Sequence, residues 1–254
     1  MHKYEETAIV IRQEEIADDI YSMWIRTENI AGEAKAGQFL SLYCNEGSRL
    51  LPRPISICEI DKKDKAIRLV YRVAGKGTEE FSALHTGSQV RVVGPLGNGF
   101  PKKELSAFLI GGGIGIPPML QLAKELNCEK KMILGFRNEL FLMDEFKKQG
   151  EVYVATEDGG VGTRGNVLDA IAENGLTADI IYACGPIPML RALKEYAKER
   201  GMECYISMEE RMACGIGACL ACVCQSTEKD AHSNVNNKRV CKEGPVFAAE
   251  EVEL

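Results

Sequence analysis

Residues 208–224 read MEERMACGIGACLACVC, and this stretch decides how the rest of the chain is organised. Cys214, Cys219 and Cys222 stand in a C-x4-C-x2-C spacing, and Cys241 can supply a fourth thiolate from a separate turn. This spacing is typical of the plant-type ligation of a [2Fe–2S] cluster. The two glycines between the first two cysteines allow a tight bend around the inorganic core, and apolar neighbours keep water away from it. The stretch therefore predicts a small iron–sulfur domain at the end of the chain.

Two other interpretations of these cysteines are open. A C-x2-C pair is also typical of structural zinc, and Cys224 offers a further ligand. Zinc knuckles usually carry two separated C-x2-C pairs, however, whereas this chain has one. Disulfides or free thiols are the remaining possibility. The iron–sulfur cluster is the first prediction, and Cys224, two residues past Cys222 on a turn, is expected to face away from it.

Length, composition and charge limit the class of protein. A chain of 254 residues suits two domains and a small appendage, and its 45% apolar and 27% charged content is that of an ordinary globular protein. The net charge of −6 argues against nucleic acid as a partner. The sequence has neither an apolar run of membrane-spanning length nor a signal peptide, so no membrane association is expected. Ten cysteines without an export signal predict a reducing, cytoplasmic location.

The first hundred residues are rich in short β-type runs separated by turns. In residues 66–73, for example, apolar and arginine side chains alternate, as in a strand with one buried face. Six or so such runs without a long helix predict a small closed antiparallel barrel.

Two segments of this barrel region carry residues suited to a phosphate. Arg53-Pro54-Ile55-Ser56 opens a strand, where the guanidinium and the hydroxyl can hold a pyrophosphate. Gly77 and Thr78 stand at the start of a helix expected over 79–84, where free N–H groups attract an anion. The alternatives are an ordinary strand edge for the first segment and a solvated helix cap for the second.

After residue 101 the pattern becomes one of alternating strands and helices. Strands are expected at 107–110, 131–136, 151–156, 180–184 and 203–207, with helices at 119–127, 140–148, 167–174 and 188–200. Five strands with short crossovers predict a doubly wound parallel sheet, whose ligands bind at the carboxyl ends of the strands.

Three glycine-rich loops fall at those carboxyl ends. They are the loop with Gly111, Gly112, Gly113 and Gly115, the turn Cys184-Gly185-Pro186, and the segment 156–165. The first loop is not a G-x-G-x-x-G fingerprint, since Ile116 takes the place of the last glycine. Each loop alone can be a simple turn, but three at one sheet edge predict a nucleotide site.

The order of these motifs resembles that of the ferredoxin reductase superfamily, which pairs a flavin-binding barrel with a nicotinamide-nucleotide domain. The appended cysteine stretch, with Cys241-Lys242-Glu243-Gly244-Pro245 after it, resembles more specifically the electron-transfer subunits of B-type dihydroorotate dehydrogenases, over essentially the whole chain. The resemblance implies an FAD-binding barrel in 1–101, an NAD-binding α/β domain in 102–207 and a [2Fe–2S] domain in 208–254.

The resemblance also implies which residues hold each cofactor. NAD would lie across the 111–115 loop and the 184–186 turn, and the cluster would bind Cys214, Cys219, Cys222 and Cys241. The last ligand follows a long polar insertion, 225–240. FAD would be held by Arg53, Pro54, Ile55, Ser56, Val70, Tyr71, Arg72, Gly77 and Thr78.

The implied function is electron transfer in pyrimidine (UMP) biosynthesis. Electrons would pass from the FMN of a separate catalytic subunit through the cluster and FAD to NAD+, in a heterotetramer with two copies of each subunit. No general acid or base is needed, and we expect ordinary roles for His2, His85 and His232. The apolar segment 216–223 is the expected docking surface.

Two alternatives to this function remain. One is the reductase subunit of a ferredoxin:NAD(P) or sulfide-type iron–sulfur flavoprotein. Here Arg137 can attract a 2′-phosphate while Glu139 would repel it, so the choice between NAD and NADP stays open. The other is a non-catalytic zinc-binding interaction module.

Overall fold

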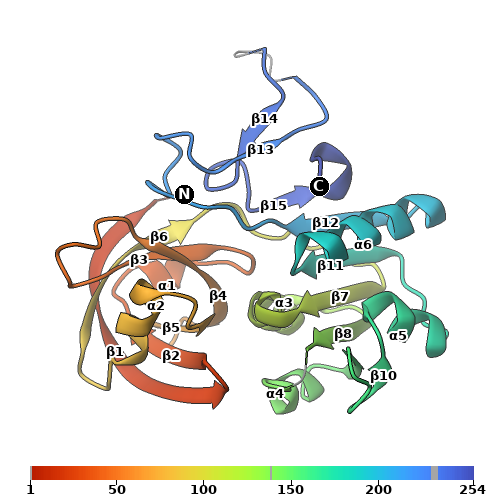
Figure 1. The fold of residues 1–254 in the computed structure, drawn as a ribbon, viewed down its shortest axis with the longest axis horizontal. Coiled ribbons are helices and arrows are strands. Elements are labelled where there is room, and N and C mark those ends of the chain that lie inside the picture. Colours follow the sequence, from red (N-terminus) through yellow and green to blue (C-terminus); the bar gives the residue numbers. More distant parts are fainter. Residues whose placement is uncertain (1, 138, 230–233) are drawn as a thin grey trace.

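The computed structural model describes residues 2–137, 139–229 and 234–254, and its N-terminal part is a closed antiparallel barrel (Figure 1). The strands follow one another around the barrel in the order β1-β2-β5-β4-β3-β6, which confirms the predicted architecture. Two short helices, α1 (Ile30–Glu33) and α2 (Lys76–Ser82), accompany them. The strands are β1 (Tyr4–Ala17), β2 (Ile20–Arg26), β3 (Phe39–Tyr43), β4 (Arg53–Asp61), β5 (Ala66–Arg72) and β6 (Gln89–Leu96).

Strand β3 shows how alternation separates the inside of the barrel from the outside. Leu40 and Leu42 are fully buried in the barrel core, because successive side chains of a strand point to opposite faces. Phe39, on the other face, packs in a different core that extends to the nucleotide sheet and the cysteine segment. The outer face of β3 is therefore covered by the rest of the molecule rather than by water.

The second part is a seven-stranded sheet in the order β10-β9-β8-β7-β11-β12-β15. All neighbours pair in parallel except β12 and β15. The five predicted strands are present as β7 (Ala107–Gly112), β8 (Lys130–Phe136), β9 (Glu151–Thr156), β11 (Ile180–Cys184) and β12 (Glu203–Ser207). The two others, β10 (Thr163–Arg164) and β15 (Val246–Ala248), are too short to carry a periodic signal.

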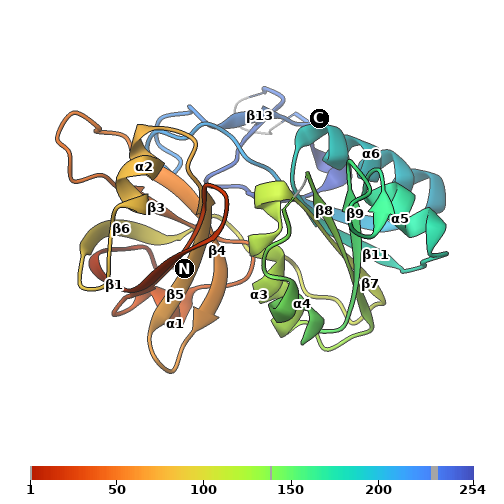
Figure 2. The ribbon, with the colours of Figure 1, turned by 60° about the horizontal axis from the view of Figure 1, so that its bottom comes forward.

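Helices cover both faces of this sheet, as expected of a doubly wound fold. Helices α3 (Pro117–Glu125) and α4 (Met143–Lys147) lie on the face turned toward the barrel (Figure 2). Helices α5 (Val167–Glu173) and α6 (Ile187–Arg200) cover the opposite face. Between β7 and α3 the chain makes one 3-10 turn, η1 (Gly113–Gly115).

The starts of α2 and α4 each differ from the prediction by three residues, for local reasons. Helix α2 begins at Lys76 rather than at residue 79, because the Thr78 hydroxyl accepts hydrogen bonds from the N–H groups of Ala74 and Gly75 and so caps an earlier turn. Helix α4 begins after Leu142 instead of at residue 140, since Leu142 has a φ of 60° and cannot continue a right-handed helix.

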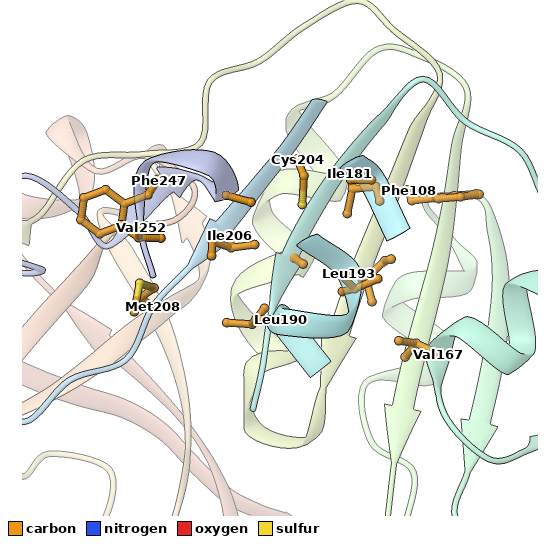
Figure 3. Packing of buried hydrophobic residues seen from close by; sticks show 14 of the residues in the cluster. Phe108, Val167, Ile181, Leu190, Leu193, Cys204, Ile206, Met208, Phe247 and Val252 are labelled. Carbon is orange, nitrogen blue, oxygen red and sulfur yellow. The ribbon is translucent and has the colours of Figure 1, made fainter. Parts of the chain in front are cut away.

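The C-terminal segment crosses from the barrel to the sheet. It forms the hairpin β13 (Val223–Gln225) and β14 (Asn237–Arg239), then returns as β15 and the turn η2 (Ala249–Glu251). Phe247 and Val252 pack in one cluster with Ile206 of β12 and with Met208, which follows that strand (Figure 3). The domain division at residues 101 and 207 stays a prediction, and the hydrophobic core is continuous across the second boundary.

A buried ion network joins the barrel to the nucleotide domain. Arg68 of β5 is only 6% exposed and donates to Glu59 of β4 at 2.6 Å, to Glu145 of α4 at 3.1 Å and to the Ser22 hydroxyl at 2.8 Å. Lys124 of α3 pairs with the same Glu59. Buried charges require such full pairing, so the network fixes how α3 and α4 sit on the barrel. Over the described ranges, no helix is both long and apolar enough to cross a bilayer.

Candidate functional site

A cleft of about 330 Å³ lies where the barrel, the nucleotide sheet and the C-terminal segment meet. Six residues predicted to hold FAD line it: Pro54, Ile55, Ser56, Val70, Tyr71 and Arg72. These residues belong to β4 and β5, which are joined by a turn and pair side by side in the barrel. The cleft is thus formed by predicted residues on one side.

The other residues that line the cleft are not among those predicted to hold FAD. They come from β3, from the 3-10 turn η1, from the end of β12 with the segment after it, and from the turn before β15. They are Phe39, Ile114, Ser207, Met208, Glu209, Glu210, Met212 and Pro245. The motif MEE at 208–210 was visible in the sequence, but only the fold shows that it faces the barrel strands.

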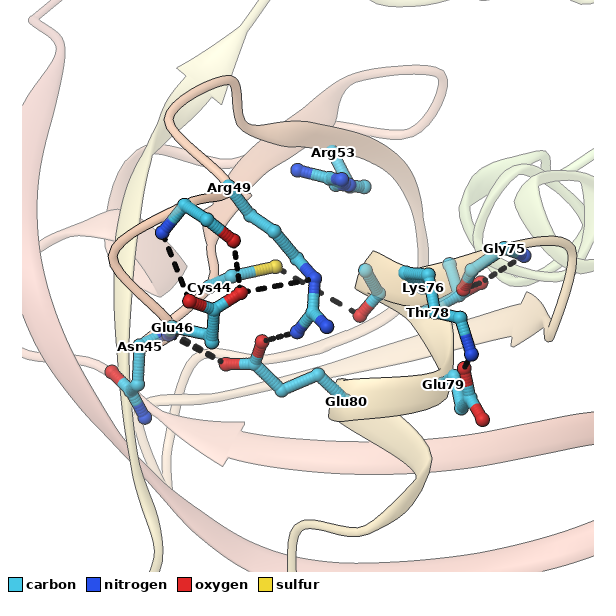
Figure 4. Close-up of polar contacts among 12 residues, drawn as sticks. Cys44, Asn45, Glu46, Arg49, Arg53, Gly75, Lys76, Thr78, Glu79 and Glu80 are labelled. Atoms are coloured by element: carbon cyan, nitrogen blue, oxygen red, sulfur yellow. Dashed lines mark hydrogen bonds and ion pairs between the residues drawn. The ribbon is translucent and has the colours of Figure 1, made fainter.

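Arg53 and Gly77 lie together beside this cleft. A Cβ added to Gly77 would stand 2.0 Å from Nε and 2.5 Å from Cζ of Arg53, so the guanidinium rests directly on the glycine. Figure 4 shows Arg53 next to the start of α2, near the ion pair of Arg49 with Glu80. The Thr78 hydroxyl is engaged in the cap, and it donates to the carbonyl of Gly75 at 3.0 Å. A positive charge held over a helix start suits a pyrophosphate.

The glycine loop after β7 packs against the turn after β11. Gly111 and Cys184 are register partners in the sheet, which places the two loops side by side. A Cβ on Gly115 would lie 2.4 Å from the Cys184 carbonyl oxygen, and one on Gly112 would lie 3.0 Å from Cδ of Pro186. The atoms that approach Gly115 belong to the backbone, so only glycine permits this contact, whereas Gly112 is approached by the Pro186 ring.

Gly113 has a different environment from its neighbours in the loop. Its φ is 54°, and no atom lies within 4 Å of a Cβ built on it. The turn η1 that it begins contacts β5 of the barrel. The carboxyl edge of the sheet thus opens beside the barrel strands that line the cleft, as a nicotinamide acting on a flavin requires.

The predicted cluster ligands form two pairs. The Cys214 N–H lies 3.5 Å from Cys219 Sγ, and the Cys241 N–H lies 3.4 Å from Cys222 Sγ. The β13–β14 hairpin brings Cys241 back, because the Val240 N–H donates to the Cys222 carbonyl at 2.9 Å. In the part of the chain that the structure describes, no three His, Cys, Asp or Glu side chains converge on one point as a single metal ion needs.

Paired thiols suit two irons, each taking two thiolates, better than one zinc ion. The insertion between the ligands therefore serves to return Cys241, while Cys224 is buried in the adjacent apolar core.

Backbone N–H groups point at the first thiol. Burial opposes ionisation of Cys214, but N–H donors from Ile216 at 3.5 Å and Ala218 at 3.3 Å, with the neighbouring Cys219, outweigh it and lower its pKa to about 6. Burial and the neighbouring Cys222 instead raise the pKa of Cys241 to about 12. The loop thus already holds its donors where thiolate and sulfide sulfurs need them.

Phe39 connects the cleft with the thiols. Its ring lines the cleft and belongs to the same buried cluster as Cys222 and Cys241. Pro245, from the turn that follows Cys241, lines the cleft too. Phe39, Met212 and Pro245 therefore form a wall that the cleft shares with the cysteine segment.

Comparison with known proteins identifies the family. Residues 209–253 match the family described as the iron–sulfur cluster binding domain of dihydroorotate dehydrogenase B. The chain is 44% identical to the dihydroorotate dehydrogenase B (NAD(+)), electron transfer subunit, of Fusobacterium nucleatum, and the match covers 98% of both chains. The subunit of the same name in Bacillus cereus is 43% identical, over 98% of this chain and 99% of the relative. The chain belongs to this family of electron transfer subunits.

Solved structures support the same fold. The structure of the NADH-dependent reduced ferredoxin-NADP oxidoreductase superposes with a TM-score of 0.87 at 29% identity, covering 98% of this chain and 90% of that one. The ferredoxin reductase of carbazole 1,9a-dioxygenase, with a TM-score of 0.67 and 20% identity over 80% of this chain and 67% of that one, shares the fold of the barrel and sheet. The predicted resemblance is confirmed. The alternative of a non-catalytic zinc module is wrong, because the curated relatives are oxidoreductase subunits.

The remaining predicted residues lie outside the cleft. His85 is exposed, with Nδ1 3.3 Å from the Ser88 hydroxyl, and His232 lies outside the described residues. Arg137 is exposed after β8, whereas the Glu139 carboxylate accepts a hydrogen bond from the Asp18 N–H of the barrel at 2.9 Å. Glu139 is thus held partly by the barrel.

Proposed function

We propose that this chain is the electron transfer subunit of a NAD-linked dihydroorotate dehydrogenase. It carries electrons from the FMN of a separate catalytic subunit, through a [2Fe–2S] cluster and FAD, to NAD+ in pyrimidine biosynthesis. The observation that carries this proposal is the wall that the cleft and the cysteine segment share at Phe39, because electron transfer requires the carriers to lie close together. The curated relatives named above support the reaction and the partner.

Each part of the chain has a physical task in this function. When bound, the cluster exchanges single electrons and the flavin exchanges two with a nicotinamide, so together they connect one- and two-electron chemistry. Arg53 and Gly77 hold the pyrophosphate of FAD, while Pro54 and Val70 offer apolar surface to its ring system. Gly113 leaves room for NAD at the carboxyl edge of β7. Hydride transfer between these groups needs no general acid or base from the chain.

The catalytic subunit docks, in this proposal, at the thiol loop. Ile216, Leu220 and Val223 are exposed by 46%, 60% and 38%, although they are apolar, and they flank the exposed Cys219 in the sequence. Apolar side chains clustered in this way mark an interaction site. The expected assembly has two copies of each subunit. A cytoplasmic location is part of the proposal too, since all ten cysteines are free thiols.

Co-expression with the FMN subunit tests the proposal. The purified complex should contain iron, FAD and FMN and should reduce NAD+ with dihydroorotate under anaerobic conditions. Leu220→Asp should abolish that reaction but leave NADH oxidation by ferricyanide intact, because only docking is lost. Ile9→Asp, at an exposed apolar residue of β1, is the matched control and should leave both activities unchanged. Failure of NADH to bleach the cluster in the wild-type chain would disprove the proposal.

A second candidate function is favoured by one observation. The solved structure with a TM-score of 0.87 has a name that includes ferredoxin-NADP oxidoreductase, so a ferredoxin:NAD(P) reductase subunit is the alternative. Stopped-flow reduction with NADH and NADPH separates the two. A strong preference for NADPH, together with co-purification of a partner lacking FMN, would favour the alternative.

A further inference from the structure

Ser41 is a buried residue on the outer face of β3, and the described residues around it offer its hydroxyl group no hydrogen bond. It is 1% exposed. Its main chain lies opposite Pro54 of the FAD-binding segment. Burying a hydroxyl without a partner is unfavourable, so its partner is expected to be a group that binds this chain.

The surroundings of Ser41 indicate where that partner lies. A Cβ added to Gly215 would stand 2.8 Å from the Ser41 oxygen and 3.3 Å from Cδ1 of Leu96, so the hydroxyl faces the thiol loop directly after Cys214. Phe39 lines the flavin cleft two residues earlier on the same face of β3, whereas Ser41 is not among the residues that line it. The hydroxyl is thus on the cluster side of the shared wall.

The acceptors expected on that side are sulfurs. The Cys214 thiol already receives the N–H groups of Ile216 and Ala218. Hydrogen bonds to the sulfurs of an iron–sulfur cluster help to set its reduction potential, because a donor stabilises the more negative, reduced state. A hydroxyl beside the same ligand adds a donor from the barrel rather than from the loop.

We propose that the Ser41 hydroxyl donates a hydrogen bond to the sulfur shell of the cluster beside Cys214 and raises the reduction potential of the cluster. This inference rests on the proposed function insofar as it requires the [2Fe–2S] cluster. Ser41 is then a residue that tunes the cluster from outside the ligand loop, and it couples the flavin-binding barrel to the cluster that the barrel faces.

Redox titration of the full chain, loaded with cluster and FAD and monitored by EPR, tests the role of Ser41. Ser41→Ala should make the cluster harder to reduce, by about a tenfold change in the one-electron equilibrium constant, or about 59 mV. Pulsed EPR in D2O should show an exchangeable deuteron coupled to the wild-type cluster that Ser41→Ala lacks. Ser22→Ala is the matched control, since it removes a buried hydroxyl bonded to Arg68 and should leave the potential unchanged.

The outcomes separate this inference from the proposed function. An unchanged potential and an unchanged deuteron signal in Ser41→Ala, at full iron and flavin content, would overturn it. If Ser41→Ala binds no cluster, Ser41→Cys replaces it, because a thiol has nearly the same shape but is a weaker donor. Its potential must fall as well, and an unchanged value refutes the inference. A wild-type chain that binds no iron would instead refute the proposed function, since this titration uses neither dihydroorotate nor the partner.

Discussion

Replacing Gly115 by alanine should slow the reduction of FAD by NADH, while FAD and the iron–sulfur cluster stay bound. The added methyl group would stand 2.4 Å from the Cys184 carbonyl oxygen, 2.5 Å from its carbonyl carbon and 2.6 Å from the Gly185 nitrogen. Carbon atoms in normal contact are about 3.5–4.0 Å apart. The loop must therefore retreat from the turn by about 1 Å, and because all three atoms belong to the backbone, no side chain can move aside.

The size of the effect follows from that displacement. Overpacking of this kind costs about 1–3 kcal/mol of folding free energy. A misplacement of about 1 Å in a group that positions a reactant can lower a rate by about 100-fold. We therefore expect Gly115→Ala to lower the rate of FAD reduction by NADH by about 10- to 100-fold, with a modest loss of thermal stability.

Stopped-flow absorbance gives the measurement. The flavin band should bleach slowly with NADH but normally with dithionite, and the iron content should equal that of the wild type. Gly32→Ala is the control: no atom lies within 4 Å of its added Cβ, it lies in α1 away from the cleft, and both rates should stay normal. A Gly115→Ala protein that is reduced by NADH at the wild-type rate would show that the contact between the loops does not position the nucleotide.

Three further predictions concern the other cofactors. Gly77→Ala should displace the Arg53 guanidinium and weaken FAD binding about tenfold or more, measured as flavin retained after gel filtration, since the new Cβ would lie 2.0 Å from Arg53 Nε. Cys224→Ala should keep full iron content at a cost of about 1 kcal/mol in stability, whereas loss of iron would make this buried thiol a ligand. Burial opposes ionisation of Glu243, but hydrogen bonds from Arg239 outweigh this effect and lower the pKa of the carboxyl group below its ordinary 4.5. The ion pair of Glu243 with Arg239 therefore stabilises the protein above pH 4.5, and this stabilisation is lost as pH falls through the folded-state pKa. Urea unfolding should accordingly show Glu243→Gln less stable than wild type by under about 1 kcal/mol at pH 7, with the difference shrinking as pH falls below 4.5. A difference that stays undiminished as pH is lowered would contradict this.

The sequence predicted those parts of the molecule whose signals are local. The strands β9, β11 and β12 occur at the predicted residues, because a short apolar run bounded by turns defines a buried parallel strand by itself. Strand β15 gave no such signal. It is three residues long, and it forms only because β12 offers a free edge at the place where the cysteine segment returns.

The candidate site divides in the same way. Pro54 and Ser56 could be predicted because they belong to a short motif, whereas Val70 followed only from the resemblance to a known family. Phe39 and Ser41 could not, because a strand in sequence does not reveal which of its two faces meets another domain. In the barrel, the inner face of β3 is closed by Leu40 and Leu42, which leaves the outer face for the wall between flavin and cluster.

Contacts between domains leave no local signal in the sequence, so the positions of FAD, NAD and the cluster relative to one another could be inferred only from the fold. In a parallel sheet, register sets the carboxyl ends of β7, β11 and β12 at one edge, and that edge turns its loops toward β5 of the barrel. The segment that leaves β12 must then pass the cleft before it reaches the first thiol, so Met208 and Glu209 line the flavin site of necessity. The cluster loop ends on the outer face of β3 because the chain is short: five Cα–Cα steps lead from Glu209 to Cys214. At roughly 3.3–3.6 Å per residue, they span at most about 18 Å, which keeps the cluster beside the flavin however the loop bends.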